Sequence, residues 1–141
     1  MASDSPRRLA LMSIRPRFAR LIMVGKKKVE FRKVKFREEV SHIVIYATAP
    51  VQRVVGYFDV AYVDEDSPKQ LWNRYGMDGG ISYDELRVYY AYSSRGIAIG
   101  IGKVRVFRKP VSLSAVCDAP TPPQSFTYLS ADAFETIRTF A

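Results

Sequence analysis

The sequence predicts an α+β fold, a small β-barrel of five to six mostly antiparallel strands with short helices at its periphery. Short runs rich in β-branched and aromatic residues recur along the chain and are bounded by Gly, Pro and Ser. The predicted helices are few and do not alternate regularly with these strands, which argues against a doubly wound sheet. With 141 residues, the chain predicts one domain over residues 9–141, preceded by a disordered N-terminal lead-in over residues 1–8.

The first part of the domain is predicted as strand, helix, strand. Residues 9–14 form a short apolar run. A proline suited to the first helical turn and a glycine suited to the position after the last turn bound a helix over residues 16–24. The pattern then changes to a period of two, which places Glu30 and Arg32 on the same face of the next strand.

Two further strands, residues 42–48 and 53–63, are predicted to be antiparallel neighbours. In the first of them, alternation puts Tyr46 on the face opposite to Ile45. Gly56 interrupts the second and indicates a bulge or a close approach of two backbones.

Two short helices are predicted next, beginning after the capping residues Ser67 and Ser82 and ending at Gly76 and near Tyr92. The segment between them, residues 77–80, is predicted to be a mobile turn. This insertion is rich in aromatic residues: Trp72, Tyr75, Tyr83, Tyr89, Tyr90 and Tyr92. Aromatic residues at helical spacing are usually core, but a minority exposed at a cleft would form a stacking platform for single-stranded nucleic acid.

The C-terminal part begins with the longest predicted strand, residues 97–107, whose glycines suit a tight bend and do not form a phosphate-loop motif. A final strand is predicted at residues 110–113. A proline-rich connector over residues 118–123 then leads to a last helix, capped by Ser130 and ending at Thr139.

The positive charge of the chain is concentrated near its N-terminus. The net charge is +8, but residues 1–37 carry +10 and the remainder carries −2. A localised basic field attracts polyanions by neutralising phosphates and releasing counterions. A basic face that only aids solubility is the alternative.

Other functional classes have little support in the composition. A single cysteine, Cys117, excludes an intramolecular disulfide and a multi-cysteine zinc site. The one histidine, His42, opens an apolar strand and is interpreted as structural. We predict no metal and no cofactor. No apolar run reaches the roughly 18 residues of a membrane helix, so we predict a cytoplasmic protein without a membrane partner.

The spacing G-x-K-x-x-E-x-R, formed by Gly25, Lys27, Glu30 and Arg32, resembles the signature of the ASCH domain family, a branch of the PUA-like superfamily. The segment A-L-M-S-I-R-P-R-F-A-R-L-I before it is similar to the opening of that family, and P-P-Q-S-F-T-Y-L to its closing segment. The resemblance covers roughly residues 9 to 130. It implies a PUA-like barrel with a cleft that binds RNA or nucleotides.

We therefore predict RNA binding across a basic cleft, with a regulatory role in RNA metabolism or transcription. In this hypothesis Arg32 and Lys27 hold phosphate, and Glu30 accepts hydrogen bonds from a base or a sugar hydroxyl. The predicted contacts are Ser13, Arg15, Arg17, Lys27, Glu30, Arg32, Tyr46 and Ser125. The partner is RNA or another nucleic acid, or else a nucleotide or modified nucleoside. The alternative interpretation of the motif is a solvated Glu/Arg pair at a strand end, which contributes little to stability. The oligomeric state stays open.

Three alternatives remain. A metal-independent ribonuclease would use the same cleft, with Lys27, Glu30 and Tyr46 in acid-base or electrostatic roles. Some relatives resembling the family hydrolyse the acetyl amide of a modified cytidine through G-x-K-T-x-T-x-R, but here Lys28 and Glu30 replace the two threonines. A protein-interaction module is the third.

Overall fold

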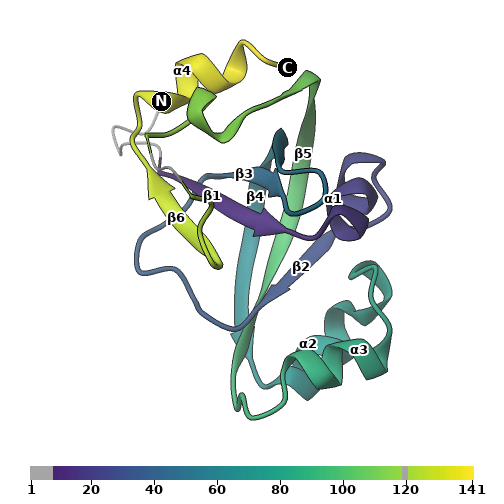
Figure 1. Cartoon of the computed structure of the whole chain (residues 1–141). Helices are drawn as coiled ribbons and strands as arrows, with labels where there is room; N and C mark the ends of the chain where they lie inside the picture. The colour runs from purple at the N-terminus through teal and green to yellow at the C-terminus, as the bar shows by residue number, and fades with distance from the viewer. Residues whose placement is uncertain (1–7, 119–120) are drawn as a thin grey trace.

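Six strands form a single curled sheet that encloses the core as a half-barrel (Figure 1). The strands are β1 (Leu9–Ile14), β2 (Val29–Arg32), β3 (His42–Ala47), β4 (Arg53–Asp66), β5 (Gly96–Val111) and β6 (Phe126–Leu129). Their order is β2-β5-β4-β3-β1-β6. Only the β1 and β3 pairing is parallel among the pairings described. The predicted α+β class with five to six mostly antiparallel strands is confirmed, and the number is six.

This computed structural model describes residues 8–118 and 121–141. The predicted lead-in therefore lies outside the described residues except for Arg8, whose carbonyl accepts a hydrogen bond from the Ser41 backbone N–H. Two residues of the predicted connector, 119 and 120, also lie outside them.

Short helices lie around the sheet. The α-helices are α1 (Pro16–Met23), α2 (Pro68–Tyr75), α3 (Tyr83–Tyr89) and α4 (Ala133–Arg138), and the 3-10 helices are η1 (Gly76–Asp78) and η2 (Leu113–Ala115). The predicted caps of the insertion are confirmed, since the side chains of Ser67 and Ser82 accept hydrogen bonds from the backbones of Gln70 and Glu85. In Figure 1, α2 and α3 lie at one end of the long β4 and β5 ribbon, and α4 lies at the other. No helix in the described part of the chain is long and apolar enough to cross a membrane.

Alternate residues of the central strands pack into two apolar clusters. Ile43 and Ile45 of β3 belong to the first cluster, which α1 covers with Ala19 and Ile22. Val44 and Tyr46, which alternate with them along β3, belong to the second cluster, and α4 covers that cluster with its apolar face. A third cluster joins the α2–α3 insertion to β2 and β5. The insertion is thereby fixed against one edge strand of the sheet.

The predicted irregularity at Gly56 is confirmed. The register between β4 and β5 shifts at this residue, and a Cβ atom on it would lie 2.6 Å from the carbonyl oxygen of Arg105. The two backbones approach so closely that a larger residue would push the strands apart.

Three C-terminal boundaries differ from the prediction. Residues 110–113 do not form a separate strand, because β5 continues through Val111 and a 3-10 turn follows. The last helix begins at Ala133, since the residues after Ser130 form a turn in which the Ser130 carbonyl accepts from the Ala133 N–H. β6 was not predicted as a strand, and its four residues are too few to establish a period.

Candidate functional site

A cavity of about 670 Å³ opens between β1, the start of α1, β2 and α3. This volume lies within the roughly 300–1,000 Å³ typical of small-molecule sites. Its apolar wall includes Phe18, Phe31 and Tyr89, and its polar wall includes Ser13, Thr48 and Gln124. Aromatic and polar groups thus face the same space.

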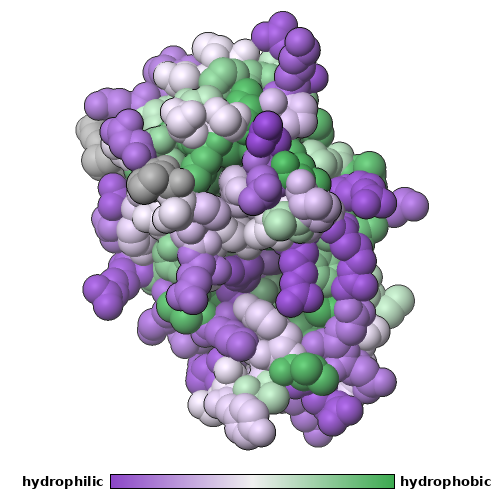
Figure 2. Space-filling view, in the orientation of Figure 1, coloured by the Kyte–Doolittle hydropathy of each residue, from purple (hydrophilic) through white to green (hydrophobic). Residues whose placement is uncertain are grey.

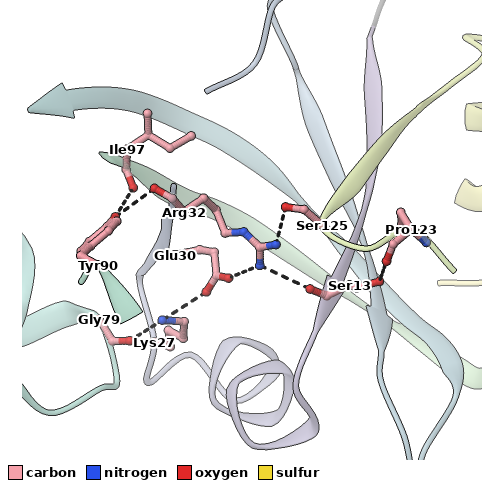
Figure 3. A network of polar contacts seen from close by, with 9 residues as sticks. All are labelled: Ser13, Lys27, Glu30, Arg32, Gly79, Tyr90, Ile97, Pro123 and Ser125. Atoms are coloured by element: carbon pink, nitrogen blue, oxygen red, sulfur yellow. Dashed lines mark hydrogen bonds and ion pairs between the residues drawn. The ribbon is translucent and has the colours of Figure 1, made fainter. Parts of the chain in front are cut away.

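A buried ionic network forms one wall of this cavity (Figure 3). The Glu30 carboxylate lies at its centre, with Oε1 3.3 Å from Lys27 Nζ and Oε2 3.1 Å from Arg32 Nη1. The exposed fractions of these side chains are 3% for Lys27, 8% for Glu30 and 13% for Arg32. The motif spacing explains the arrangement, because Glu30 and Arg32 share a face of β2 and Lys27 lies in the loop that leads into that strand.

The network is also anchored to distant parts of the chain. Lys27 Nζ donates to the carbonyl oxygen of Gly79, in the turn between α2 and α3 that was predicted to be mobile. That turn contains η1, and the Asp78 carbonyl accepts a hydrogen bond from the Lys28 N–H in the loop before β2. Arg32 donates to the Ser13 carbonyl at 3.3 Å and to Ser125 Oγ at 2.7 Å (Figure 3).

These Arg32 contacts join the two edges of the sheet. β2 is one edge strand and β6 is the other. Arg32 extends from β2 to Ser13 in β1 and to Ser125, which directly precedes β6. Ser13 Oγ in turn donates to the Pro123 carbonyl at 2.6 Å. β2 and β6 are not paired by backbone hydrogen bonds. The hydrogen bonds of the Arg32 guanidinium therefore close the half-barrel between them.

Burial changes the acid-base properties of the site. Desolvation lowers the pKa of Lys27, and the neighbouring Glu30 carboxylate partly opposes that shift. Burial raises the pKa of Tyr89 in the cavity wall and of Tyr90 behind it. The single proton of the Tyr90 hydroxyl is shared between the carbonyl oxygens of Arg32 and Ile97, which ties the C-terminal cap of α3 to β2 and β5.

The charges lining the cavity are balanced in number. Three are positive (Arg15, Lys27 and Arg32) and three are negative (Glu30, Asp84 and Glu85). Arg15 is the exposed cation of this set. Only three of the cations of residues 1–37 are thus in the cavity wall, and most of the others are exposed elsewhere. The face shown in Figure 2 is largely hydrophilic.

Most of the predicted site residues are brought together. Five of the eight line the cavity: Ser13, Arg15, Lys27, Glu30 and Arg32. Ser125 contacts it through Arg32, and the Arg17 side chain forms an ion pair with Glu85 at its rim. Tyr46 is 5% exposed and lies in the second apolar cluster, so the side chain that alternation placed opposite Ile45 is in the core and not in the wall of this cavity.

Sequence reasoning missed the wall contributed by α3. Asp84, Glu85, Val88 and Tyr89 line the cavity, but the sequence predicts here only a helix that begins after Ser82, with aromatic residues that are usually core. The contact between α3 and β2 joins segments more than fifty residues apart, and no local pattern indicates it. The aromatic density of the insertion was the one usable signal.

His42 lies outside this cavity wall. Its Nδ1 is 2.8 Å from Ser41 Oγ, and its Nε2 is 3.2 Å from Asp59 Oδ1. The ring packs on Tyr57 and Phe134, in keeping with the structural interpretation. Over residues 8–118 and 121–141, no cluster of three or more His, Cys, Asp or Glu residues could hold a metal ion.

Comparison with known proteins connects this architecture to characterised chains. No family model matches the sequence. A Zymomonas mobilis protein named ASCH domain-containing ribonuclease is 33% identical over 132 residues, which covers 90% of this chain and 88% of that protein.

Solved structures agree with this relationship. The crystal structure of a serine-to-alanine variant of the Zymomonas mobilis ASCH protein superposes with a TM-score of 0.85 at 29% identity, covering 95% of this chain and 96% of that one. The N-terminal domain of Staphylothermus marinus McrB shares the fold, with a TM-score of 0.59 at 16% identity over 94% of both chains. The sequence relationship spans nearly the whole of both proteins, and the chain belongs to the ASCH domain family.

Proposed function

We propose that this protein binds single-stranded RNA and takes one nucleotide into the cavity beside the Lys27, Glu30 and Arg32 network. The observation that carries the proposal is a nucleotide-sized, partly aromatic cavity of about 670 Å³ in a chain similar over almost its full length to a protein named a ribonuclease. A base inside a duplex could not enter such a cavity, whereas an unstacked base could.

The residues that line the cavity indicate where the base and the phosphate of the nucleotide lie. Phe18, Phe31 and Tyr89 offer ring surfaces to a base. The equal numbers of acidic and basic residues in the wall do not favour a phosphate deep inside, where Glu30 would repel it. Arg15, exposed at the N-terminal end of α1, is the cation available for the phosphate. The base enters and the backbone stays at the rim.

The binding test compares two arginines near one helix. Arg15 lines the cavity, whereas Arg20 is an exposed residue of α1 outside its wall. We expect Arg15→Ala to weaken binding of a labelled single-stranded RNA about fivefold, equivalent to about 1 kcal/mol, with little change for Arg20→Ala. Fluorescence anisotropy at low salt measures both. Equal losses in the two variants would indicate diffuse attraction and contradict a site at the cavity.

RNA cleavage is the second candidate, favoured by the name of the Zymomonas mobilis relative. In cleavage without a metal, the 2′-hydroxyl loses its proton to a base, its oxygen bonds to phosphorus, and the 5′-oxygen leaves with a proton from an acid. In this mode the sugar-phosphate backbone, and not the base, would lie beside the buried network. The lowered pKa of Lys27 makes its neutral amine more accessible as the base, and Arg32 can stabilise the added charge on the phosphate.

The cleavage test uses end-labelled RNA in EDTA with the wild type and Lys27→Met, which keeps the apolar stem of the side chain. Discrete shorter products that disappear with the variant would support cleavage by this site. Products that require added magnesium would contradict the metal-independent mechanism, and an intact, shifted band would leave binding as the activity.

A further inference from the structure

A second pocket, of about 300 Å³, lies on the other side of α3. It is lined by residues of α2, of α3 and of the turn after α3, and Leu86 lines both this pocket and the larger cavity. The two hollows are thus separated by a single helix. An α-helix with its side chains is only about 10–12 Å across, a distance that a few nucleotides of an extended single strand cover.

Two aromatic rings form the wall of this second pocket. The Trp72 and Tyr83 rings lie 5.3 Å apart at 61°, an edge-to-face arrangement, and both line the pocket. Tyr83 is 49% exposed. In an edge-to-face pair, the ring that presents its edge keeps both of its own faces clear of the partner. An exposed ring face offers a stacking surface to a nucleobase.

The position of the indole is fixed by the chain around it. A Cβ atom on Gly76 would lie 2.6–2.8 Å from three atoms of the Trp72 ring, so the ring lies flat against the glycine backbone. Glycine at this position lets the indole stay against α2. The stacking surface is therefore held in place before any ligand arrives.

The charged residues that line this pocket are of one sign. Lys69 and Arg87 are the charged residues among those that line it, and both are exposed. Arg87 also pairs with Asp84 at 3.6 Å, but with the two side chains 65% and 84% exposed this ion pair is weak and easily exchanged. The larger cavity, by contrast, has equal numbers of both signs. A planar apolar surface with two cations at its rim is complementary to a base that carries a phosphate.

We propose that this pocket is a second nucleotide subsite, in which a base of the RNA stacks on the Trp72 and Tyr83 pair and its phosphate is bound by Lys69 and Arg87. The subsite rests on the proposed RNA binding, of which it names a further contact. The RNA strand then crosses α3 from the cavity to this pocket.

Trp72 is the only tryptophan of the chain, so its fluorescence reports on this pocket. The experiment titrates a short single-stranded RNA into the protein at low salt, with excitation selective for tryptophan, and follows anisotropy of the same RNA, labelled, in parallel. We expect saturable quenching with the same midpoint in both signals. Tyr83→Ala should weaken binding about tenfold, as expected for one stacked base, and Arg87→Ala by a smaller factor. Arg95→Ala, which removes an exposed cation after α3 outside this pocket, should change neither signal.

The two signals together distinguish failure of the subsite from failure of the cavity proposal. Binding by anisotropy with unchanged Trp72 emission would overturn the subsite and leave the cavity proposal standing. Quenching with the same midpoint in Arg15→Ala as in the wild type would support the subsite while contradicting the role of the cavity rim. Absence of both signals would overturn both proposals.

Discussion

Lys27 carries an ammonium group into the interior, where its side chain is only 3% exposed. Moving such an ion out of water costs several kcal/mol, which attraction to a carboxylate repays only when hydrogen bonds satisfy the remaining protons. Here the partners of the ammonium group are one carboxylate and one carbonyl, from Glu30 and Gly79. The lowered pKa shows that burial outweighs this compensation.

The first prediction concerns the pH dependence of stability. Because the pKa of Lys27 is lower in the folded protein than in the unfolded chain, the unfolded state binds more protons between the two values, and folding is favoured as pH rises through that window. The free energy of unfolding of the wild type should therefore rise relative to that of Lys27→Met from the lowered pKa up to about 10.4, the ordinary value for lysine, and then level off. Urea unfolding of both proteins across this range measures the difference. A constant difference would contradict a lowered pKa.

At the scale of elements, the half-barrel depends on a contact that is not a strand pairing. Arg32 joins the edge strand β2 to the residues beside the opposite edge, through the Ser13 carbonyl and Ser125 Oγ. It also balances the charge of Glu30. The same guanidinium thus closes the sheet and shapes one wall of the cavity.

Removing this contact should destabilise the fold. Arg32→Leu would leave Glu30 with one cation and free Ser125 from its bond, and loss of one partner from a buried pair costs about 3–5 kcal/mol. Lys35→Ala breaks a surface pair with Glu65, in which the side chains are 68% and 40% exposed, and should change stability by less than about 1 kcal/mol. Chemical denaturation of the two variants gives the comparison. Losses of similar size would mean that the Arg32 contacts do not hold the sheet closed.

The position of Trp72 gives a further prediction at this scale. Gly76 has an ordinary helical backbone, with φ −56°, so alanine there meets no backbone strain. Its methyl group would instead press on the Trp72 ring, and overpacking of this kind costs about 1–3 kcal/mol. Gly76→Ala should lower the thermal midpoint and shift the Trp72 emission spectrum. Unchanged emission would show that the ring does not rest on Gly76.

Local patterns in the sequence predict the elements and only part of the site. The caps at Ser67 and Ser82 and the period of two in β2 depend on neighbouring residues, so the sequence contains enough to predict them. The contacts of Arg32 with Ser125 and of Lys27 with Gly79 join residues 93 and 52 positions apart. Only the resemblance to the family indicated a cleft near Ser125, and the aromatic density of the insertion was the one indication of the wall formed by α3.

For the whole molecule, alternation identifies the two faces of a strand but not what covers each of them. Tyr46 lies on the predicted face of β3, yet that face is closed by α4 and its neighbours and is part of the core. The curvature of the sheet decides which faces become interior, and it follows from bulges such as that at Gly56 acting together over several strands. The curvature therefore depends on several strands at once and cannot be predicted from the residue pattern of one strand.

The last prediction is the salt dependence of RNA binding. Residues 1–37 carry a charge of +10 in a chain whose net charge is +8, whereas three exposed cations, Arg15, Lys69 and Arg87, are assigned to phosphates. Each phosphate contact with a single strand contributes about 0.7 to the slope of log K against log salt, so three contacts predict a slope near −2 and an affinity about 20-fold lower at about 200 mM than at about 50 mM salt. Arg15→Ala should reduce the slope by about 0.7. A much steeper slope, unaffected by this substitution, would show that the basic N-terminal quarter attracts RNA as a diffuse field and that the two hollows beside α3 do not position its phosphates.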